Sequence, residues 1–472
     1  MLKKTKIVAT ISDKKCEVEF IRELFEAGMN VVRLNTAHLG FDQAKRVIDN
    51  VRRVSDRIAI LIDTKGPEIR TSAFGAELEV KTGDTVKVYG NPMGHTGEDI
   101  LYVSYPNITK EVKKGAYLLI DDGEIELRVV ENTGTYLECQ ATNHGVIKFR
   151  KSVNIPNVSI DLPSLTEKDK QFIEFAIANK LDFIAHSFVR TKQDVIDIKN
   201  IIKKHNSDIK IIAKIENQQG VDNIDEILDH TYGIMVARGD LGIEIPAEKI
   251  PPIQRYLINK CVESKKPVII ATQMLHTMIE HPRPTRAEIN DVASAIYQRA
   301  DAIMLSGETA YGQYPVDAVK TMTRVAQEVE CMLSADPDIP LTRIHNMVTA
   351  TLARNAVRAC GTLPIKAIVV DTMSGRTGRY LSAFRGKVPV YAMCYNATVM
   401  RQLALSFGIL ANYMDITESR DSFLSDAIST LVENKKITED DMVLVVGGSF
   451  GPGNGASFME ISEVKNLMIK HK

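Results

Sequence analysis

The chain has 472 residues, and its 59 Lys and Arg against 60 Asp and Glu give a net charge of −1. This balance argues against a protein that binds nucleic acid or another polyanion. No apolar stretch approaches the ~20 residues of a membrane-spanning helix, and the six cysteines lack the short spacing of zinc or redox motifs. We therefore expect a soluble, cytoplasmic protein of about three domains, without a membrane partner.

Short runs rich in Val and Ile alternate with amphipathic segments from the first residues onward. Such runs are typical of strands buried on both faces. They lie at residues 6–11, 29–34, 58–63, 182–188, 210–215, 232–237, 267–272 and 302–306. Helical patterns between and after them include 18–27, 43–54, 167–179, 195–204, 255–264 and 318–332. Eight strands alternating with helices predict a (β/α)8 TIM barrel, and an open doubly wound sheet is the alternative.

The alternation is interrupted after the third predicted strand. Short alternating runs replace it, separated by turn signals such as Thr82-Gly83-Asp84 and Asp122-Gly123. These features predict a small all-β domain. Because that domain is inserted in a loop at the catalytic end of the barrel, it can act as a lid.

A second alternation follows a predicted linker at residues 336–340. Helical patterns lie at 347–358, 376–384 and 398–407, and strand patterns lie at 367–371, 388–393 and 442–446. They predict a separate C-terminal α/β domain. The expected organisation is a barrel of residues 1–66 and 162–335, an inserted lid of residues 67–161 and a C-terminal domain of residues 336–472.

Polar residues gather at the predicted strand ends, where barrels carry their catalytic groups. Lys214 and Glu216 are two apart on one strand, so their side chains leave the same face. With Asp240 from the next strand, two carboxylates would suit Mg²⁺, and nearby cations would neutralise a transferring phosphoryl group. A lone Lys-x-Glu would more simply be an ion pair, but the convergence of Arg33 and Arg70 favours a functional site.

Five ordered stretches make the chain resemble the pyruvate kinases over its whole length. They are residues 63–71 (DTKGPEIRT), 214–217 (KIEN), 234–246 (IMVARGDLGIEIP), 271–275 (ATQML) and 304–310 (MLSGETA). The resemblance implies a barrel with an inserted β lid and a C-terminal α/β domain. It also implies phosphoryl transfer from phosphoenolpyruvate to ADP, giving pyruvate and ATP.

Roles for individual residues follow from the resemblance. Lys214 would stabilise charge on the phosphoryl group and the enolate oxygen, and Glu216 and Asp240 would hold Mg²⁺. Arg33 and Arg70 would grip phosphate. The substrate carboxylate would be seated by the amides of Gly239 and Asp240 together with Thr272.

The nucleotide and K⁺ positions are also carried over from the resemblance. Asn35, His38, Arg70 and Lys151 match the nucleotide side, although spacing alone makes His38 an ordinary loop histidine. Asn35, Asp63 and the carbonyl of Thr64 match K⁺ ligands. The family's serine ligand is replaced by Ala37, whereas Glu68 is the residue that accompanies K⁺ use. We therefore expect Mg²⁺ and an altered K⁺ site.

A loop in the C-terminal domain resembles the family's effector phosphate loop. Its residues are Thr372, Ser374, Gly375, Arg376 and Thr377. Hydroxyls and a glycine before a helix can bind a phosphate at the helix N-terminus, and capping by Ser374 is the simpler alternative. A phosphorylated effector is therefore expected, and the resemblance suggests a homotetramer.

Two other functions stay open on sequence alone. One is a Mg²⁺-dependent lyase or aldolase acting on a pyruvate-containing substrate, against which Lys65, Arg70 and the long lid argue. The other is a catalytically inactive regulator that binds a sugar phosphate, against which the Lys214, Glu216 and Asp240 set argues. Ser306 and Glu308 match a motif without a firm role, and His276 stands where the family usually has glutamate.

Overall fold

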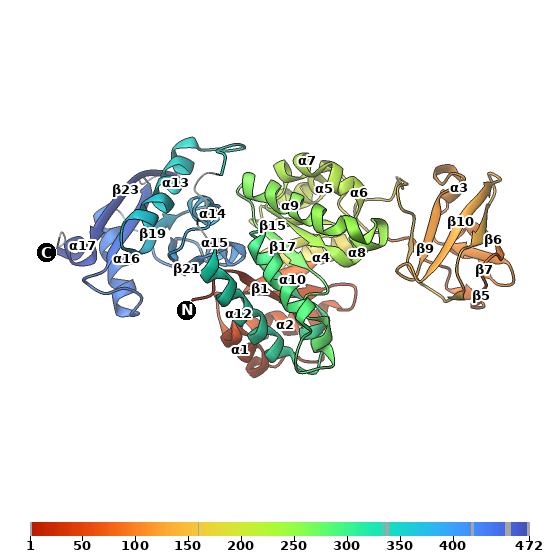
Figure 1. Ribbon diagram of the computed structural model, residues 1–472, viewed down its shortest axis with the longest axis horizontal. Helices are drawn as coiled ribbons and strands as arrows, with labels where there is room; N and C mark the ends of the chain where they lie inside the picture. Colours follow the sequence, from red (N-terminus) through yellow and green to blue (C-terminus); the bar gives the residue numbers. More distant parts are fainter. Residues whose placement is uncertain are drawn as a thin grey trace.

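The computed structural model describes residues 2–158, 160–333, 335, 339–416, 420–448 and 455–469. Figure 1 shows three parts in a row, with the barrel between the C-terminal domain and an inserted β domain. No helix in the described ranges is long and apolar enough to cross a bilayer.

Eight parallel strands form a closed barrel in the order β1-β18-β17-β16-β15-β14-β3-β2. The sheet closes because β1 pairs with β18, with Lys6 opposite Ala302. The predicted barrel is confirmed, and the open sheet is excluded. The strands are β1 (Lys6–Thr10), β2 (Val31–Asn35), β3 (Ala59–Asp63), β14 (Phe183–His186), β15 (Lys210–Ile215), β16 (Gly233–Ala237), β17 (Val268–Ala271) and β18 (Ala302–Leu305).

Helices surround the barrel and pack their apolar faces on its strands. Several begin at a capping residue, such as Thr166 before α4, whose hydroxyl accepts from the amide of Asp169. They are α1 (Val18–Ala27), α2 (Phe41–Val54), α4 (Glu167–Ala178), α5 (Lys192–Lys204), α6 (Gln218–Asp222), α7 (Ile224–His230), α8 (Arg238–Glu244), α9 (Ile250–Glu263), α10 (Arg286–Tyr297), α11 (Gly307–Ala310) and α12 (Pro315–Met332). The barrel domain also contains two short 3-10 turns, η1 (Ala247–Lys249) before α9 and η2 (His276–Ile279) before α10.

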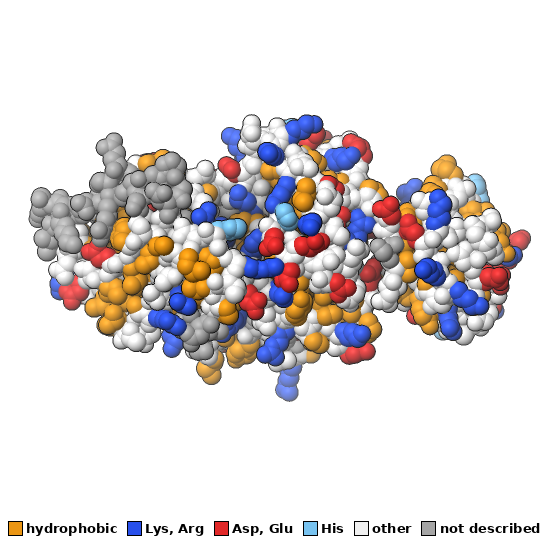
Figure 2. Space-filling view, turned by 90° about the horizontal axis from the view of Figure 1, so that it is seen from above, with side chains coloured by type: hydrophobic (Ala, Val, Ile, Leu, Met, Phe, Trp, Pro, Cys, Tyr) orange, Lys and Arg blue, Asp and Glu red, His pale blue; other side chains and the backbone are white. Residues whose placement is uncertain are grey.

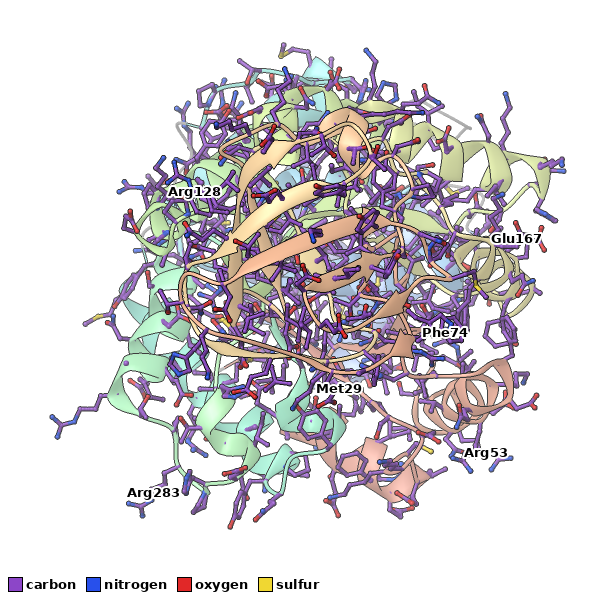
Figure 3. The ribbon with its side chains drawn as sticks, turned by 90° about the vertical axis from the view of Figure 1, so that its right-hand side faces the viewer. Met29, Arg53, Phe74, Arg128, Glu167 and Arg283 are labelled. Atoms are coloured by element: carbon purple, nitrogen blue, oxygen red, sulfur yellow. The ribbon has the colours of Figure 1, made fainter. Side chains whose placement is uncertain are left out.

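The inserted β domain has its own core, formed by residues such as Val88, Leu118 and Leu127. Its main sheet has the strand order β13-β9-β10-β11-β6-β8. Viewed from this end of the molecule, the sheet lies in front of the barrel (Figure 3). The elements are β4 (Phe74–Gly75), β5 (Leu78–Val80), β6 (Thr85–Gly90), β7 (His95–Thr96), β8 (Ile100–Val103), α3 (Ile108–Glu111), β9 (Tyr117–Ile120), β10 (Ile125–Asn132), β11 (Leu137–Ala141), β12 (Gly145–Ile147) and β13 (Val153–Asn154).

The C-terminal domain is a five-stranded sheet in the order β21-β20-β19-β22-β23, with β23 antiparallel to β22. The predicted helix 398–407 is shorter than expected, because the chain changes to a 3-10 turn and then to β21. Residues 336–338 of the predicted linker lie outside the described ranges. The elements are α13 (Met347–Thr362), β19 (Ile365–Thr372), α14 (Arg376–Ala383), β20 (Val390–Cys394), α15 (Ala397–Gln402), η3 (Leu403–Leu405), β21 (Ile409–Tyr413), α16 (Arg420–Glu433), β22 (Met442–Gly448), β23 (Ala456–Glu463) and α17 (Val464–Ile469).

Candidate active site

Lys214 lies near the carboxyl end of β15 and is only 8% exposed. Its Nζ is 2.9 Å from Oε1 of Glu216 and 3.1 Å from Oδ1 of Asp63, and it donates to Oγ of Ser187 at 2.7 Å. Lys214 and Glu216 therefore do leave the same face of the strand. Acceptors from three neighbouring strand ends fix the ammonium in one position.

Asp63, at the end of β3, lies between two cations. Arg33 donates from Nε to Oδ2 of Asp63 at 2.6 Å, while Lys214 approaches the other carboxylate oxygen. Burial alone would raise the pKa of Asp63, but Lys214 and Arg33 outweigh it and hold the pKa below its usual value. Asp63 thus stays ionised and orients both cations.

Lys214 stays protonated although it is buried. Burial would lower its pKa, but Asp63, Glu216 and Asp240 together raise it above the usual value. A fixed ammonium in a site of low polarity interacts strongly with any negative charge that develops beside it.

Glu216 is the second buried carboxylate of this cluster, and its Oε2 accepts from the backbone amide of Phe188 at 2.6 Å. Burial raises the pKa of Glu216 above its usual value, Lys214 opposes this shift, and Asp240 adds to it. Two carboxylates that repel each other are a suitable pair of ligands for a divalent cation. Among the described residues, no group of three or more His, Cys, Asp and Glu side chains is arranged to hold a metal ion. The pair Glu216 and Asp240 nevertheless suits Mg²⁺, because this ion takes few protein ligands and completes its shell with water and substrate oxygens.

The first turn of α8, which follows β16 directly, and the loop after β17 meet beside this pair. The amide of Gly239 donates to Oγ1 of Thr272 at 2.8 Å, and Arg238 Nη2 donates to the carbonyl of Thr272 at 2.6 Å. Thr272 and Gln273 have φ values of 69° and 55°. Left-handed backbone at two consecutive non-glycine residues is strained, and such strain is common where a loop shapes a functional site.

Arg70 lies where the chain enters the inserted β domain. Its Nε is 2.6 Å from Oε2 of Glu68, and its Nη1 donates to the carbonyl of Arg150 at 2.6 Å. Lys151 is paired within the inserted domain, with Nζ 2.8 Å from Asp121, and His38 is exposed. The cluster around Lys214 therefore includes Arg33 and Asp63. Among the described contacts, neither Lys151 nor the side chain of His38 bonds to a residue of this cluster.

The predicted K⁺ positions form a second polar group beside Asp63. Oδ1 of Asn35 accepts from the amide of Ala37 at 3.1 Å. The hydroxyl of Thr36 donates to the carbonyl of Asp63 at 2.9 Å. The carbonyl of Thr64 accepts from Oγ of Ser187 at 2.6 Å. Because its hydrogen is directed to the carbonyl of Asp63, the Thr36 hydroxyl is held in one orientation.

Sequence reasoning missed Ser187 and gave no role to Glu308. Ser187 follows β14 directly and links Lys214 to the loop at Thr64. Its position after a buried strand was the signal that could have found it. Glu308 is 2% exposed and accepts from the amides of Leu275 and Ser306, at 3.1 Å and 2.8 Å. It therefore fixes the loops after β17 and β18, whereas His276 is exposed.

A cleft of about 570 Å³ opens between the inserted domain and the barrel. Pro67 and Ile155 line one side, and Phe188, Asn217 and Asp240 line the other. Figure 2 shows the inserted domain set apart from the barrel at this point. The cleft gives a ligand access to the carboxylates at the strand ends.

The predicted effector loop joins β19 to α14. Its Gly375 has φ 74° and its amide donates to Oγ1 of Thr372 at 2.8 Å. No side chain caps α14, and the residue at its N-cap is Gly375. The alternative in which Ser374 caps this helix is therefore wrong, because Thr372 stabilises the loop instead.

The strand ends of this closed barrel carry the buried ammonium of Lys214, two adjacent carboxylates and the guanidinium of Arg33, which Asp63 holds in place. These groups are typical of a barrel enzyme that acts on an anionic substrate. Comparison with known proteins makes this class specific. The family model for the barrel domain of pyruvate kinase matches residues 2–319, and the model for its alpha/beta domain matches residues 350–462.

Relatives support the same family over the full length. A pyruvate kinase of Borreliella burgdorferi is 46% identical, covering 99% of this chain and 98% of the relative. A pyruvate kinase of Geobacillus stearothermophilus is 42% identical, and the match covers 100% of this chain and 82% of that relative. The solved structure of a pyruvate kinase from Cryptosporidium parvum matches with a TM-score of 0.92 and 34% identity. The match covers 98% of this chain and 96% of that structure.

The chain therefore belongs to the pyruvate kinase family. Pyruvate kinases are phosphotransferases that act between phosphoenolpyruvate and ADP, and the match supports this function here. Neither the lyase nor the inactive regulator is favoured.

Proposed function

We propose that Lys214, Glu216 and Asp240 carry the transfer of a phosphoryl group from phosphoenolpyruvate to ADP in this chain. The observation that carries this proposal is the buried ammonium of Lys214, 2.9 Å from Glu216 and 3.1 Å from Asp63. Positive charge held in place where negative charge develops is the largest single contribution to many enzymatic rates.

Each residue has a distinct part in the proposed mechanism. As the phosphorus–oxygen bond to the enol breaks and a bond to a phosphate oxygen of ADP forms, Lys214 stabilises the charge on the phosphoryl group and on the enolate oxygen. Arg33, oriented by Asp63, grips the phosphate. The amides of Gly239 and Asp240, with Thr272, hold the substrate carboxylate, for which the Gly239 amide exchanges its bond to Oγ1 of Thr272 for one to the substrate. Mg²⁺, held by Glu216 and Asp240, supplies further charge neutralisation when bound.

We assign nucleotide binding to the side of the site that Asn35, His38, Arg70 and Lys151 form. The ion pair of Arg70 with Glu68 supports this assignment, because it holds a guanidinium at the root of the inserted domain. Closure of that domain over the barrel would then bring Lys151 toward the substrates. The inserted domain thus serves as a lid.

The Mg²⁺ assignment is tested by Glu216→Gln and Asp240→Asn. Each change removes one ligand charge, so we expect each variant to need at least ~10-fold more Mg²⁺ for half-maximal activity. Binding of Mn²⁺, followed by electron paramagnetic resonance, should weaken in parallel. Asp222→Asn is the matched control, because Asp222 lines the same cleft but lies on α6. Unchanged metal affinity in both variants would place the metal elsewhere.

We also propose that K⁺ binds among Asn35, Asp63 and the carbonyl of Thr64, with a weakened site. Ala37 offers a methyl group in place of a hydroxyl ligand, and the Thr36 hydroxyl is engaged with the carbonyl of Asp63. Water can fill the missing ligand position, because a hard cation accepts water oxygen readily.

Ala37→Ser is expected to lower the K⁺ concentration that gives half-maximal rate, since it restores one oxygen ligand. The rate at saturating K⁺ should change little. The measurement is a K⁺ titration of turnover in buffer whose ionic strength is kept by an organic cation. Full activity of the parent chain without K⁺ or Na⁺ would contradict the proposed site.

Three further features are proposed with support from the family alone or from the loop geometry. The loop of Thr372, Ser374, Gly375, Arg376 and Thr377 is assigned to a phosphorylated effector, supported by the open N-terminus of α14. A homotetramer and a cytoplasmic location are proposed because the chain belongs to a family of glycolytic enzymes.

A further inference from the structure

The chain returns from the inserted domain to the barrel through residues 160–162, and an arginine of the barrel holds this segment. Arg190 donates from Nη1 to the carbonyl of Ile160 at 3.0 Å and from Nη2 to the carbonyl of Leu162 at 2.8 Å. All three residues line the cleft between the two domains. Figure 1 shows narrow connections between the inserted domain and the barrel beside α6 and α8. One planar guanidinium thus binds two carbonyls of such a connection.

The same segment is also bound from the side of the inserted domain. The amide of Asp161 donates to Oε2 of Glu111 at 3.3 Å, and Oε1 of Glu111 accepts from the hydroxyl of Tyr105 at 2.6 Å. The side chains of Ile160 and Leu162 pack against the hydrophobic core of the inserted domain. Contacts to both domains therefore alternate along three residues. Residues 160–162, which we call the hinge segment, suit the boundary about which one domain moves on another.

Arg190 itself is fixed to the barrel. Its amide donates to Oδ2 of Asp194 at 2.9 Å, and its Nη2 donates to Oδ1 of Asp194 at 3.1 Å. Its carbonyl accepts from Nδ2 of Asn223 at 2.9 Å. Asp194 lies in the first turn of α5 and is buried, and hydrogen bonds to an ionised group are roughly twice as strong as neutral ones. The guanidinium therefore keeps its position independently of the inserted domain.

Arg190 also ends a short segment that contacts the Lys214 cluster. The amide of Phe188 donates to Oε2 of Glu216 at 2.6 Å, and the amide of Val189 donates to the carbonyl of Lys214 at 3.3 Å. Phe188 has φ 54°, a left-handed conformation that a non-glycine residue keeps only where its surroundings enforce it. The contact to the hinge segment and the contact to the proposed Mg²⁺ ligand are thus two residues apart in one fixed stretch of chain.

We propose that Arg190 is a positioning residue for phosphoryl transfer, because it fixes the hinge segment about which the inserted domain closes over the nucleotide. This inference rests on the proposed function and on the proposed lid. Phosphoenolpyruvate is assigned to the barrel, whereas the lid covers the nucleotide, so loss of the guanidinium acts on ADP more than on phosphoenolpyruvate. Lys214 and Glu216 stay in place, since the residues before Arg190 keep their own backbone bonds.

The test replaces Arg190 by Ala and by Lys in the full chain. Arg190→Ala is expected to raise the KM for ADP at least ~10-fold, because it removes two hydrogen bonds from a charged donor. The KM for phosphoenolpyruvate and the Mg²⁺ requirement should stay close to those of the parent chain. Arg190→Lys keeps the charge beside Asp194 but lacks the fork that spans two carbonyls, so its KM for ADP should be intermediate.

Lys192→Ala is the matched control. It removes a positive charge two residues away, at the first residue of α5, where Lys192 lies 3.4 Å from Glu226. The hinge contacts are untouched, so both KM values should equal those of the parent chain.

Hydrogen exchange followed by mass spectrometry gives a readout of the hinge segment itself. Peptides that cover residues 160–162 should exchange faster in Arg190→Ala, whereas the amide of Phe188 should stay protected by Glu216. An unchanged KM for ADP would overturn the inference. A parallel rise of both KM values would overturn it as well, since Arg190 would then support the site as a whole. So would a raised KM for ADP without faster exchange, because Arg190 would then contact the nucleotide directly.

Two further measurements keep these outcomes separate. Far-ultraviolet circular dichroism shows whether Arg190→Ala is folded, and if it is not, Arg190→Lys decides the question by the same criteria. Turnover of the parent chain reports on the proposed phosphoryl transfer alone. An inactive parent would refute that function, whereas an active parent with Arg190 variants that behave like it would refute only the role of Arg190.

Discussion

Lys214→Met is expected to lower turnover by ~10²-fold or more, the usual cost of removing one charged group aimed at developing charge. Methionine has a similar length but no charge, so the buried space stays filled. What is lost is the ammonium that lies 2.9 Å from Glu216 and 3.1 Å from Asp63. The KM for phosphoenolpyruvate should change less than the turnover number, because the phosphate is still gripped by Arg33.

The matched measurements are Mn²⁺ binding and the far-ultraviolet circular dichroism spectrum of the variant. Both should stay close to those of the parent chain, since Glu216 and Asp240 remain in place. Lys214→Arg keeps the charge but spreads it over a planar group, so its turnover should lie between those of the parent and Lys214→Met. Near-normal turnover in Lys214→Met would end the assignment of Lys214 as a catalytic residue.

The barrel could be predicted from the sequence because its strands are buried on both faces. Runs such as residues 58–63 and 302–306 are almost wholly apolar, so they stand out between amphipathic helices. The central pair of the candidate site could be predicted for a related reason. Lys214 and Glu216 follow the period of two that a strand imposes, and the structure brings them together.

The C-terminal domain was harder to predict. Strand β21 is only partly buried, and β23 is an edge strand with little alternation in exposure, so neither has a clear apolar pattern. The short helix α15 passes directly into η3, and the apolar residues of both read as one longer helix. Local pattern identifies an element best when one face of it is fully buried.

Contacts between distant segments also escaped prediction. Ser187 meets Lys214 only because β14 and β15 are neighbours in the closed sheet. Lys199, Lys210 and Arg376 share one cavity although they come from two domains. Ser187, Lys199 and Lys210 belong to no motif named above, and the loop motif that contains Arg376 does not reveal its neighbours in the barrel. Such groupings depend on how the domains pack, and that information is absent from any single stretch of sequence.

The role of the inserted domain as a lid gives the second large expected effect. Two extended segments connect it to the barrel, and they pair with each other. The amide of Thr71 donates to the carbonyl of Lys151 at 2.9 Å, and the amide of Val153 donates to the carbonyl of Ile69 at 2.8 Å. Residues 72–150 can therefore be replaced by an Asn-Gly turn, which closes two paired strands without strain.

This truncated chain should fold, because the inserted domain has a hydrophobic core separate from that of the barrel. It keeps Glu68, Arg70 and Lys151, so any loss is due to the body of the domain. We expect ATP formation to fall by ~10²-fold or more, since an open site no longer positions ADP against the phosphoryl group. Gly134→Asn is the control, because Gly134 has φ 83° and open space around it. ATP formation and pyruvate release are measured separately, and a truncated chain that still makes ATP within tenfold of the parent rate would show that the inserted domain is not the lid.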